Sequence, residues 1–234
     1  MHVHLYHCEK DLCTHDFVSF AEGMNGYFMG TIQSRIYLCS QSPRCRELLK
    51  QIGINFEMLL LRCDPRRGVE LNDSPLDDEP AESFVQRICQ EKARTGAESL
   101  RLRSLRPFPV LAAETIVVLN GKIFGKPDNA NQAADMLRQL SGKEHQVLSA
   151  VAVALGNRTE MALSVSTVRF ASLSEDRIQR YLLSGEYADK AGAYSIQGQA
   201  GAFVECLAGS YSGVMGLPLS ETVALLQRFD YPTP

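Results

Sequence analysis

The sequence predicts an α/β fold in which a mixed central sheet is flanked by helices. Short apolar runs typical of buried strands alternate with amphipathic helical patterns from residue 35 to about residue 230, and no internal repeat is visible. A length of 234 residues, of which 45% are hydrophobic and 22% charged, is enough for one sizeable core. We therefore expect one main domain over residues 35–230.

The first half of this domain is predicted as strand, helix, strand, loop and helix. Residues 36–39 form a short apolar run that suits a buried strand, and Ser42 followed by Pro43 indicates the start of a helix that ends at Gly53. A second strand is expected over residues 55–61. A polar loop with three prolines should follow over residues 64–80. The next helix should bury Ala81, Phe84, Val85, Ile88 and Cys89.

The second half is rich in predicted strands. An apolar strand over residues 110–113 should deliver Glu114 at its end, and residues 115–119 continue extended into Asn120-Gly121, a strong hairpin signal. Asp128 is expected to cap a helix that Gly142 ends. Further predicted elements are strands over residues 145–155 and 161–170, a helix from Ser174 to Leu183, a glycine-rich turn, a short strand at residues 203–204, and a last helix over 220–229.

The segment over residues 1–34 differs from the rest in composition. It holds His2, His4, His7 and His15 together with Cys8 and Cys13. These residue types bind zinc, but their spacing matches no common zinc finger. The alternative is a poorly ordered N-terminal extension that is translated upstream of a start at Met24 or Met29.

Net charge, apolar stretches and cysteine spacing indicate which binding partners, location and disulfides to expect. A net charge of -3 and a pI near 6.0 argue against binding to a nucleic acid polymer, while a small anionic ligand needs only a few local cations. The sequence shows no bilayer-length apolar stretch and no secretory signal, so we expect a cytoplasmic protein with no membrane partner. The seven cysteines form no Cys-x-x-Cys pair, which favours reduced thiols over disulfides. A homodimer is compatible with the sequence, although nothing in it requires one.

Several polar groups follow predicted strands and together suggest a cleft for a phosphorylated ligand. Ser40-Gln41-Ser42-Pro43-Arg44 places backbone amides and a guanidinium at a helix start, where phosphate binds well, although serine and proline there are also ordinary capping residues. Glu114 could hold a divalent ion or activate water, or it could be a solvated acid. Lys126, Lys190 and Gln197 lie near turns and can reach phosphate oxygens or a base edge, while each lysine taken alone also suits a solvated position.

These motifs, in this order, resemble those of the Maf-like nucleotide pyrophosphatase family, from about residue 36 to residue 229. The matching segments are residues 38–44 (LCSQSPR), 91–93 (EKA), 125–127 (GKP), 140–142 (LSG) with His145, 189–194 (DKAGAY), 196–198 (IQG) and 216–219 (GLPL). The segments 196–198 and 209–218 resemble the branch that acts on dTTP and UTP. The resemblance implies a Maf/ITPase-like α/β fold with a nucleotide cleft.

The resemblance also implies a reaction and roles for the residues. A nucleoside triphosphate is hydrolysed to the monophosphate and pyrophosphate by water that attacks the α-phosphate, with Mg²⁺ or Mn²⁺ as cofactor. Glu114 would be the general base or the metal-holding carboxylate. The substrate-binding residues would be Ser40 and Arg44 on the triphosphate, Lys92, Lys126 and Lys190 as charge balance, and Gln197 on the nucleotide.

Three positions depart from the family pattern. Cys45 replaces a second arginine, and Arg46 follows about 100° further round the helix. Pro65 replaces an acidic residue, and Glu114 replaces an aspartate and adds one methylene. Small misplacements of a catalytic group can cost about a hundredfold in rate, so these departures favour weaker catalysis. They leave open an alternative function, a nucleotide-binding regulatory protein with weak or no turnover.

Overall fold

The computed structural model describes residues 35–61 and 74–233. Both interpretations of the segment over residues 1–34, and the departure at Pro65, concern positions outside these described residues. Within the described ranges, none of the helices combines the length and apolar character needed to cross a membrane. Cys39, Cys45, Cys89 and Cys206, the cysteines of these ranges, are all free thiols.

In the described ranges, seven strands form one mixed sheet in the order β2-β1-β3-β5-β6-β7, with β4 paired to β3. The strands are β1 (Ile36–Leu38), β2 (Phe56–Met58), β3 (Val110–Leu119), β4 (Lys122–Phe124), β5 (Glu144–Leu155), β6 (Arg158–Phe170) and β7 (Val204–Ala208). The helices are α1 (Pro43–Gln51), α2 (Ala81–Leu102), α3 (Ala130–Leu140), α4 (Glu175–Leu183), α5 (Tyr211–Met215) and α6 (Leu219–Arg228), with 3-10 turns η1 (Ala191–Ala193) and η2 (Gln199–Phe203). β1 is parallel to β2 and β3, and the remaining pairs are antiparallel. The predicted α/β fold with a mixed sheet is confirmed.

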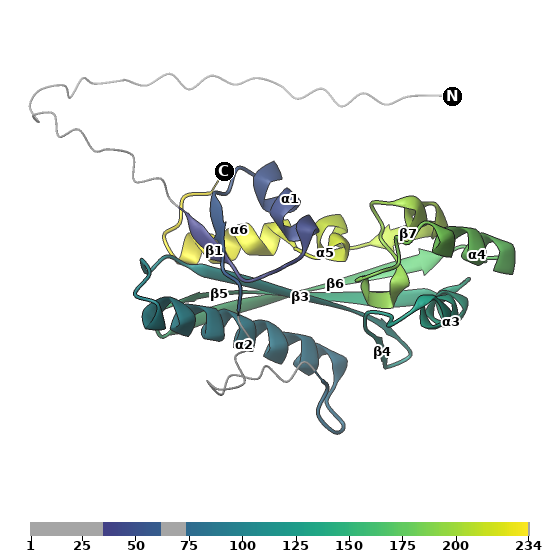
Figure 1. The fold of residues 1–234 in the computed structure, drawn as a ribbon, viewed down its shortest axis with the longest axis horizontal. Helices are drawn as coiled ribbons and strands as arrows, with labels where there is room; N and C mark the ends of the chain where they lie inside the picture. The colour runs from purple at the N-terminus through teal and green to yellow at the C-terminus, as the bar shows by residue number, and fades with distance from the viewer. Residues whose placement is uncertain (1–34, 62–73, 234) are drawn as a thin grey trace, which may run out of the picture. The chain divides into compact units, whose positions relative to one another are not determined.

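Helices cover both faces of this sheet (Figure 1). α2 lies against one face, while α1, α5 and α6 lie against the other. Because side chains alternate along a strand, β3 contributes apolar side chains to both faces of the sheet. Val110, Ala112 and Ile116 pack in the cluster that contains α2, whereas Leu111 and Ala113 pack with α1 and α6.

Several local predictions are confirmed. Asn120 and Gly121 form the β3–β4 turn with φ values of 52° and 78°, as a type I′ hairpin requires. The Ser174 side chain accepts a hydrogen bond from the Arg177 amide at the start of α4. Ser42 is the N-cap residue of α1, with Pro43 at the first helical position, although its side chain makes no capping hydrogen bond.

Three local predictions need correction. α3 is capped by Asn129, whose side chain accepts from the Gln132 amide, and not by Asp128. Glu114 does not end a strand, because β3 continues through it and pairs with β5 from Val110 to Val118. The chain between β7 and the last helix contains α5, a short helix that the sequence pattern does not predict.

Strand β3 has an interval without a partner on the side that carries β1 and β4. β1 pairs with Val110 and Leu111, and β4 pairs with residues 117–119. β5 occupies the opposite edge throughout, so β1 and β4 share the same edge. Among the described strands, none pairs with residues 112–116 along this edge. We call residues 112–116 the β3 gap, and Glu114 lies at its centre.

Candidate active site

Two loops border the β3 gap, one from each end. β1 ends at Leu38, which pairs with Leu111, so the loop that begins at Ser40 leaves the sheet beside the first residues of the gap. β4 runs antiparallel to β3 and its last residue, Phe124, pairs with Val117. The chain that follows, including Lys126, therefore starts beside the other end of the gap. Strand register thus brings the loop that begins at Ser40 and the chain that includes Lys126 to the same part of the sheet edge.

Glu114 forms an ion pair with Lys92 of α2. The distance from Lys92 Nζ to Glu114 Oε2 is 2.6 Å. The two side chains are 21% and 27% exposed, so both are partly open to solvent. Glu114 thus points to the face of the sheet that α2 covers, and its side chain stays partly accessible to solvent.

Arg44 and Cys45 connect the first turn of α1 to the end of α5. Arg44 Nε donates a hydrogen bond to the Met215 carbonyl at 3.0 Å, and Cys45 Sγ donates to the Gly216 carbonyl at 3.6 Å. Because Nε is engaged in this way, the guanidinium has a defined orientation. Arg44 lies on the face opposite to α2, so the predicted residues approach the gap from both faces.

Cys45 stands where the family resemblance leads us to expect a second guanidinium. Its side chain is buried, and burial raises the pKa of the thiol. Hydrogen bonding to Ser40 and the charge of Arg44 lower this pKa, whereas the charge of Glu114 raises it. Cys45 therefore lies near both the Ser40–Arg44 loop and Glu114, but it adds no positive charge there.

Lys190 belongs to a strained segment. Asp189 and Ala193 have φ values of 57° and 62°, in the left-handed region that favours glycine. Such strain persists only where the surrounding structure holds it, and it concentrates at functional sites. The Gly192 amide donates to the Gly125 carbonyl at 3.1 Å, so this segment is fixed to the loop that follows β4.

The electrostatic environment of Lys190 shows that cations meet here. The pKa of Lys190 is lowered, first by burial and next by the charge of Arg44, with a smaller contribution from Lys126. Asp189 and Glu186 oppose this shift without cancelling it. Lys190 therefore lies close enough to two other cations to be repelled by them.

Glu186 was not among the predicted site residues, yet it organises the turn that contains Gln197. Its carboxylate accepts hydrogen bonds from the amides of Gln199 at 2.8 Å and Ala200 at 3.3 Å. A Cβ atom on Gly198 would lie 2.2 Å from Glu186 Oε2, so the carboxylate fills the space of a side chain. The sequence carries no spacing rule for such a contact. Gln197 is exposed in this turn, and its role toward a ligand stays a prediction.

A buried aromatic cluster supports the segment that follows Lys190. His145 Nε2 and Tyr194 Oη are 3.0 Å apart, and the His145 ring meets Phe170 edge-on with centroids 4.9 Å apart. Burial lowers the pKa of His145 to about 4. The imidazole is therefore neutral near pH 7 and acts here as a packed core residue.

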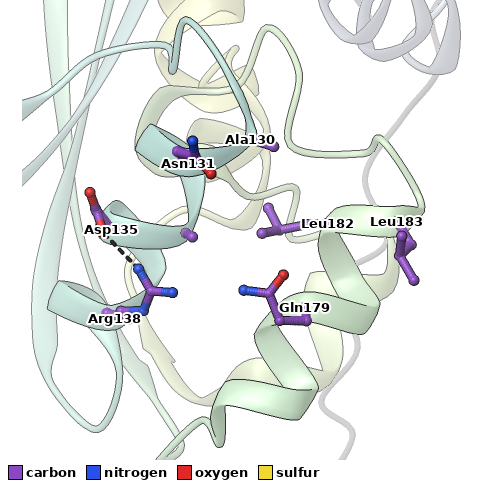
Figure 2. Close-up of a pocket in the computed structure, with 8 residues that line it drawn as sticks. Ala130, Asn131, Asp135, Arg138, Gln179, Leu182 and Leu183 are labelled. Carbon is purple, nitrogen blue, oxygen red and sulfur yellow. Dashed lines mark hydrogen bonds and ion pairs between the residues drawn. The ribbon is translucent and has the colours of Figure 1, made fainter.

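A hollow lies elsewhere, between α3 and α4 (Figure 2). It measures about 370 Å³ and is lined by Ala130, Asn131, Ala134, Asp135, Arg138, Gln179, Leu182 and Leu183. Its cation, Arg138, forms ion pairs with Asp135 and Glu175, each at 2.6 Å. None of the predicted site residues lines this hollow.

The carboxylate oxygens of Glu114 suit a divalent ion that is bound by the protein and by a ligand together. In residues 35–61 and 74–233, no group of three His, Cys, Asp or Glu side chains could hold a metal ion unaided. Mg²⁺, however, is commonly bound by one or two carboxylates together with substrate phosphates and water. One partly exposed carboxylate fits that arrangement.

Comparison with known proteins supports the motif-based resemblance. The family model described as Maf-like protein matches residues 35–229. Proteins named dTTP/UTP pyrophosphatase from Aromatoleum aromaticum and Nitrosospira multiformis are 50% and 52% identical, covering 87% and 86% of this chain and 100% and 97% of their own lengths. A third, from Chromobacterium violaceum, is 45% identical and covers 88% of this chain and 100% of its own length. The solved structure of the Staphylococcus aureus Ham1 protein is 16% identical, with a TM-score of 0.43 over 84% of this chain and 97% of that one.

The sequence matches extend over the β3 gap, both of its bordering loops and the strained segment around Lys190. Their coverage and identity leave one conclusion: this chain belongs to the Maf-like protein family.

Proposed function

We propose that this chain hydrolyses nucleoside triphosphates, dTTP and UTP among them, to the monophosphate and pyrophosphate. The observation that carries the proposal is the strand register, which places the Ser40–Arg44 loop and the chain that carries Lys126 at the two ends of the β3 gap, with the Lys190 segment bound to the latter, so that three cations lie near Glu114. Like charges held close together are unfavourable, and an anion with several charges relieves that cost. A triphosphate is such an anion. The names of the relatives support the choice of bases.

In this proposal each predicted residue has a role that follows from its position. Ser40 and Arg44 bind the triphosphate from the loop after β1, and Lys126 and Lys190 bind it from the opposite end of the gap. Gln197 holds the nucleotide from the turn that Glu186 organises. Lys92 balances charge and orients Glu114 through the 2.6 Å ion pair.

The chemistry assigned to this site is attack of water on the α-phosphorus. A new bond forms between the water oxygen and the α-phosphorus, and the bond from that phosphorus to the bridging oxygen breaks. Pyrophosphate leaves with the electron pair, and Glu114 accepts the proton that the water loses. The guanidinium and ammonium groups stabilise the charge that develops on the phosphate oxygens.

A divalent ion, Mg²⁺ or Mn²⁺, is part of this proposal. Glu114 would hold it together with phosphate oxygens, and the ion would supply neutralisation of negative charge that otherwise repels the nucleophile. Cytoplasmic location and a homodimer stay predictions of the sequence.

A second candidate function is nucleotide binding with little turnover. Cys45 favours it, because a buried, uncharged thiol occupies the position where the resemblance implies a phosphate-binding guanidinium. Both functions require nucleotide binding, so turnover alone separates them.

The deciding experiment incubates the protein with a panel of nucleoside triphosphates and either Mg²⁺ or Mn²⁺ in ¹⁸O-labelled water. The expected products are the monophosphate and pyrophosphate, with the label in the monophosphate. Label in pyrophosphate, or release of orthophosphate, would contradict attack at the α-position. Tight binding without any product would establish the second function instead.

A further inference from the structure

A row of hydroxyl groups crosses the sheet directly beneath α5. Thr115 of β3 pairs with Ser149 of β5, which pairs in turn with Ser164 of β6. Two of the three hydroxyl groups are buried, because Ser149 is 1% exposed and Ser164 is 7% exposed. Burial of a hydroxyl group costs free energy unless the group is hydrogen-bonded, so we expect these hydroxyl groups to have hydrogen-bond partners.

Ser149 has such partners on both sides. Its Oγ donates to the Gly213 carbonyl of α5 at 2.6 Å, and it lies 2.8 Å from Thr115 Oγ1. Thr115 is the neighbour of Glu114 in the β3 gap. Ser149 therefore links the strand that carries the proposed base to helix α5 on the opposite face from α2.

The end of α5 in turn holds Arg44. Arg44 Nε donates to the Met215 carbonyl at 3.0 Å, two residues beyond the carbonyl that Ser149 binds. α5 has only five residues, and Gly216 ends it with a φ of 121°. A helix this short has little internal stability, so its position depends on the contacts that hold it to the sheet.

We propose that Ser149 is a positioning residue for Arg44. It fixes α5 on the sheet, and α5 presents the Met215 carbonyl that orients the guanidinium toward the β3 gap. This inference rests on the proposed function for its effect on catalysis, but the contact between Ser149 and Arg44 through α5 can be tested without it. Ser149 does not touch the ligand, and it acts through the orientation of Arg44 alone.

The test uses Ser149→Ala and a matched control, Thr222→Val. Thr222 is also buried, at 0% exposure, and its hydroxyl donates to the Pro218 carbonyl at 2.7 Å within α6. Each variant deletes one buried hydroxyl that donates to a main-chain carbonyl, so both should lose similar stability. Thr115→Val is a third variant that removes the other partner of Ser149 and leaves the bond to Gly213.

The first readout is the ¹⁵Nε–¹Hε NMR signal of Arg44 in full-length protein, assigned by its loss in Arg44→Lys. We expect slow solvent exchange of Hε in the wild type and in Thr222→Val, and at least about tenfold faster exchange in Ser149→Ala. Thr115→Val should show an intermediate rate. Unchanged exchange in Ser149→Ala would overturn the inference whatever the activity of the protein.

The second readout is steady-state hydrolysis of dTTP and UTP. Because a displacement of a binding group by about 1 Å can cost up to a hundredfold, we expect KM to rise about tenfold in Ser149→Ala, with a smaller change in kcat. Thr222→Val should keep the wild-type KM. Equal KM values in Ser149→Ala and Thr222→Val would show that Ser149 has only a structural role. An inactive wild type would count against the proposed function, and the NMR result alone would then test whether Ser149 positions Arg44.

Discussion

The β3 gap and the α3–α4 groove are two places where a ligand could be sought, and they differ in charge balance. The groove contains a hollow, but its guanidinium, Arg138, is already paired with Asp135, as Figure 2 shows, and also with Glu175. At the gap, Lys190 is repelled by Arg44 and Lys126, while the charges of Asp189 and Glu186 attract it. We therefore expect a polyanion to bind at the β3 gap, where several cations lie near one another, and not in the groove, whose guanidinium is already paired.

The two regions also differ in how their backbone is held. The loops at the gap include residues in the left-handed region, Asp189 and Ala193, and they rely on contacts from distant segments. The groove lies between two regular helices that are capped by Asn129 and Ser174. Strained backbone and several cations thus occur together at the gap, as we expect of a site that is preorganised for a ligand.

The largest expected effect is that of Glu114→Gln. The substitution keeps the size of the side chain and removes the proton acceptor, so kcat should fall about 100- to 1,000-fold. Nucleotide affinity should change far less, because the cations of the gap are retained. Product formation measured with pyrophosphate detection, alongside calorimetric binding of dTTP, checks both parts. A variant that retains full kcat would remove Glu114 from the chemistry.

Glu114→Asp sharpens the same prediction. It restores the carboxylate with one methylene fewer, as the family pattern has it. If reach limits the wild type, the rate should increase in this variant. A loss of rate would show instead that the contact of Glu114 with Lys92 at 2.6 Å is already the productive geometry.

Acidification should weaken the support beneath Lys190. The pKa of His145 is about 4 in the folded protein because burial disfavours the imidazolium, whereas an unfolded histidine has a pKa of 6.5. Between these values the unfolded chain binds the additional proton. The contribution of neutral His145 to the free energy of unfolding is therefore fully present above pH 6.5. It is lost as the pH drops toward 4, by about 3 kcal/mol in total.

Urea unfolding between pH 7 and pH 5 measures this effect. This pH range lies above the pH values at which protonation of paired carboxylates begins to lower the free energy of unfolding. Glu79 and Glu175, each with a pKa of about 2, are such carboxylates. In His145→Gln the decline over this range should be largely absent. An equal decline in wild type and variant would assign the pH dependence to other groups.

Lys190→Met should separate function from stability. Loss of one cation weakens the hold on the triphosphate, so KM should rise about tenfold. The same change removes a partly buried charge and its repulsion from Arg44 and Lys126, which offsets the lost attraction to Asp189 and Glu186, so the unliganded protein should be about as stable as the wild type. Lys143→Met is a control of the same chemistry on an exposed lysine outside the gap. A stability loss specific to Lys190→Met would contradict the repulsion.

The sequence predicts the fold well because local signals agree with it. The Asn120-Gly121 hairpin, the Ser174 cap and the apolar residues of α2 each have a local physical cause. The motifs of the site are visible in the same way, since Ser40, Lys126 and Lys190 each follow a strand or turn. Their order identifies the family.

What the sequence does not show depends on pairing between distant segments. The sequence predicts Glu114 at a strand end, but continuous pairing with β5 carries β3 through it, and the interval over residues 112–116 follows from where β1 ends and β4 begins to pair. Ser149 and Glu186 act through main-chain groups far along the chain. Contacts to backbone atoms leave no residue pattern, so no spacing rule could have predicted them.

The smallest expected effect is that of Arg138→Met in the α3–α4 groove. The ion pairs of Arg138 are solvent-exposed, and exposed pairs contribute about 0–1 kcal/mol, so stability should change by less than about 1 kcal/mol. Because Arg138 is already paired with two carboxylates and none of the predicted site residues lines the groove, kcat/KM for dTTP and UTP should stay within about twofold of the wild type. Hydrolysis assays on Arg138→Met and Lys190→Met side by side provide the comparison. If Arg138→Met lost more activity than Lys190→Met, the nucleotide would bind in the hollow and not at the β3 gap, and charge imbalance would be the wrong criterion for this fold.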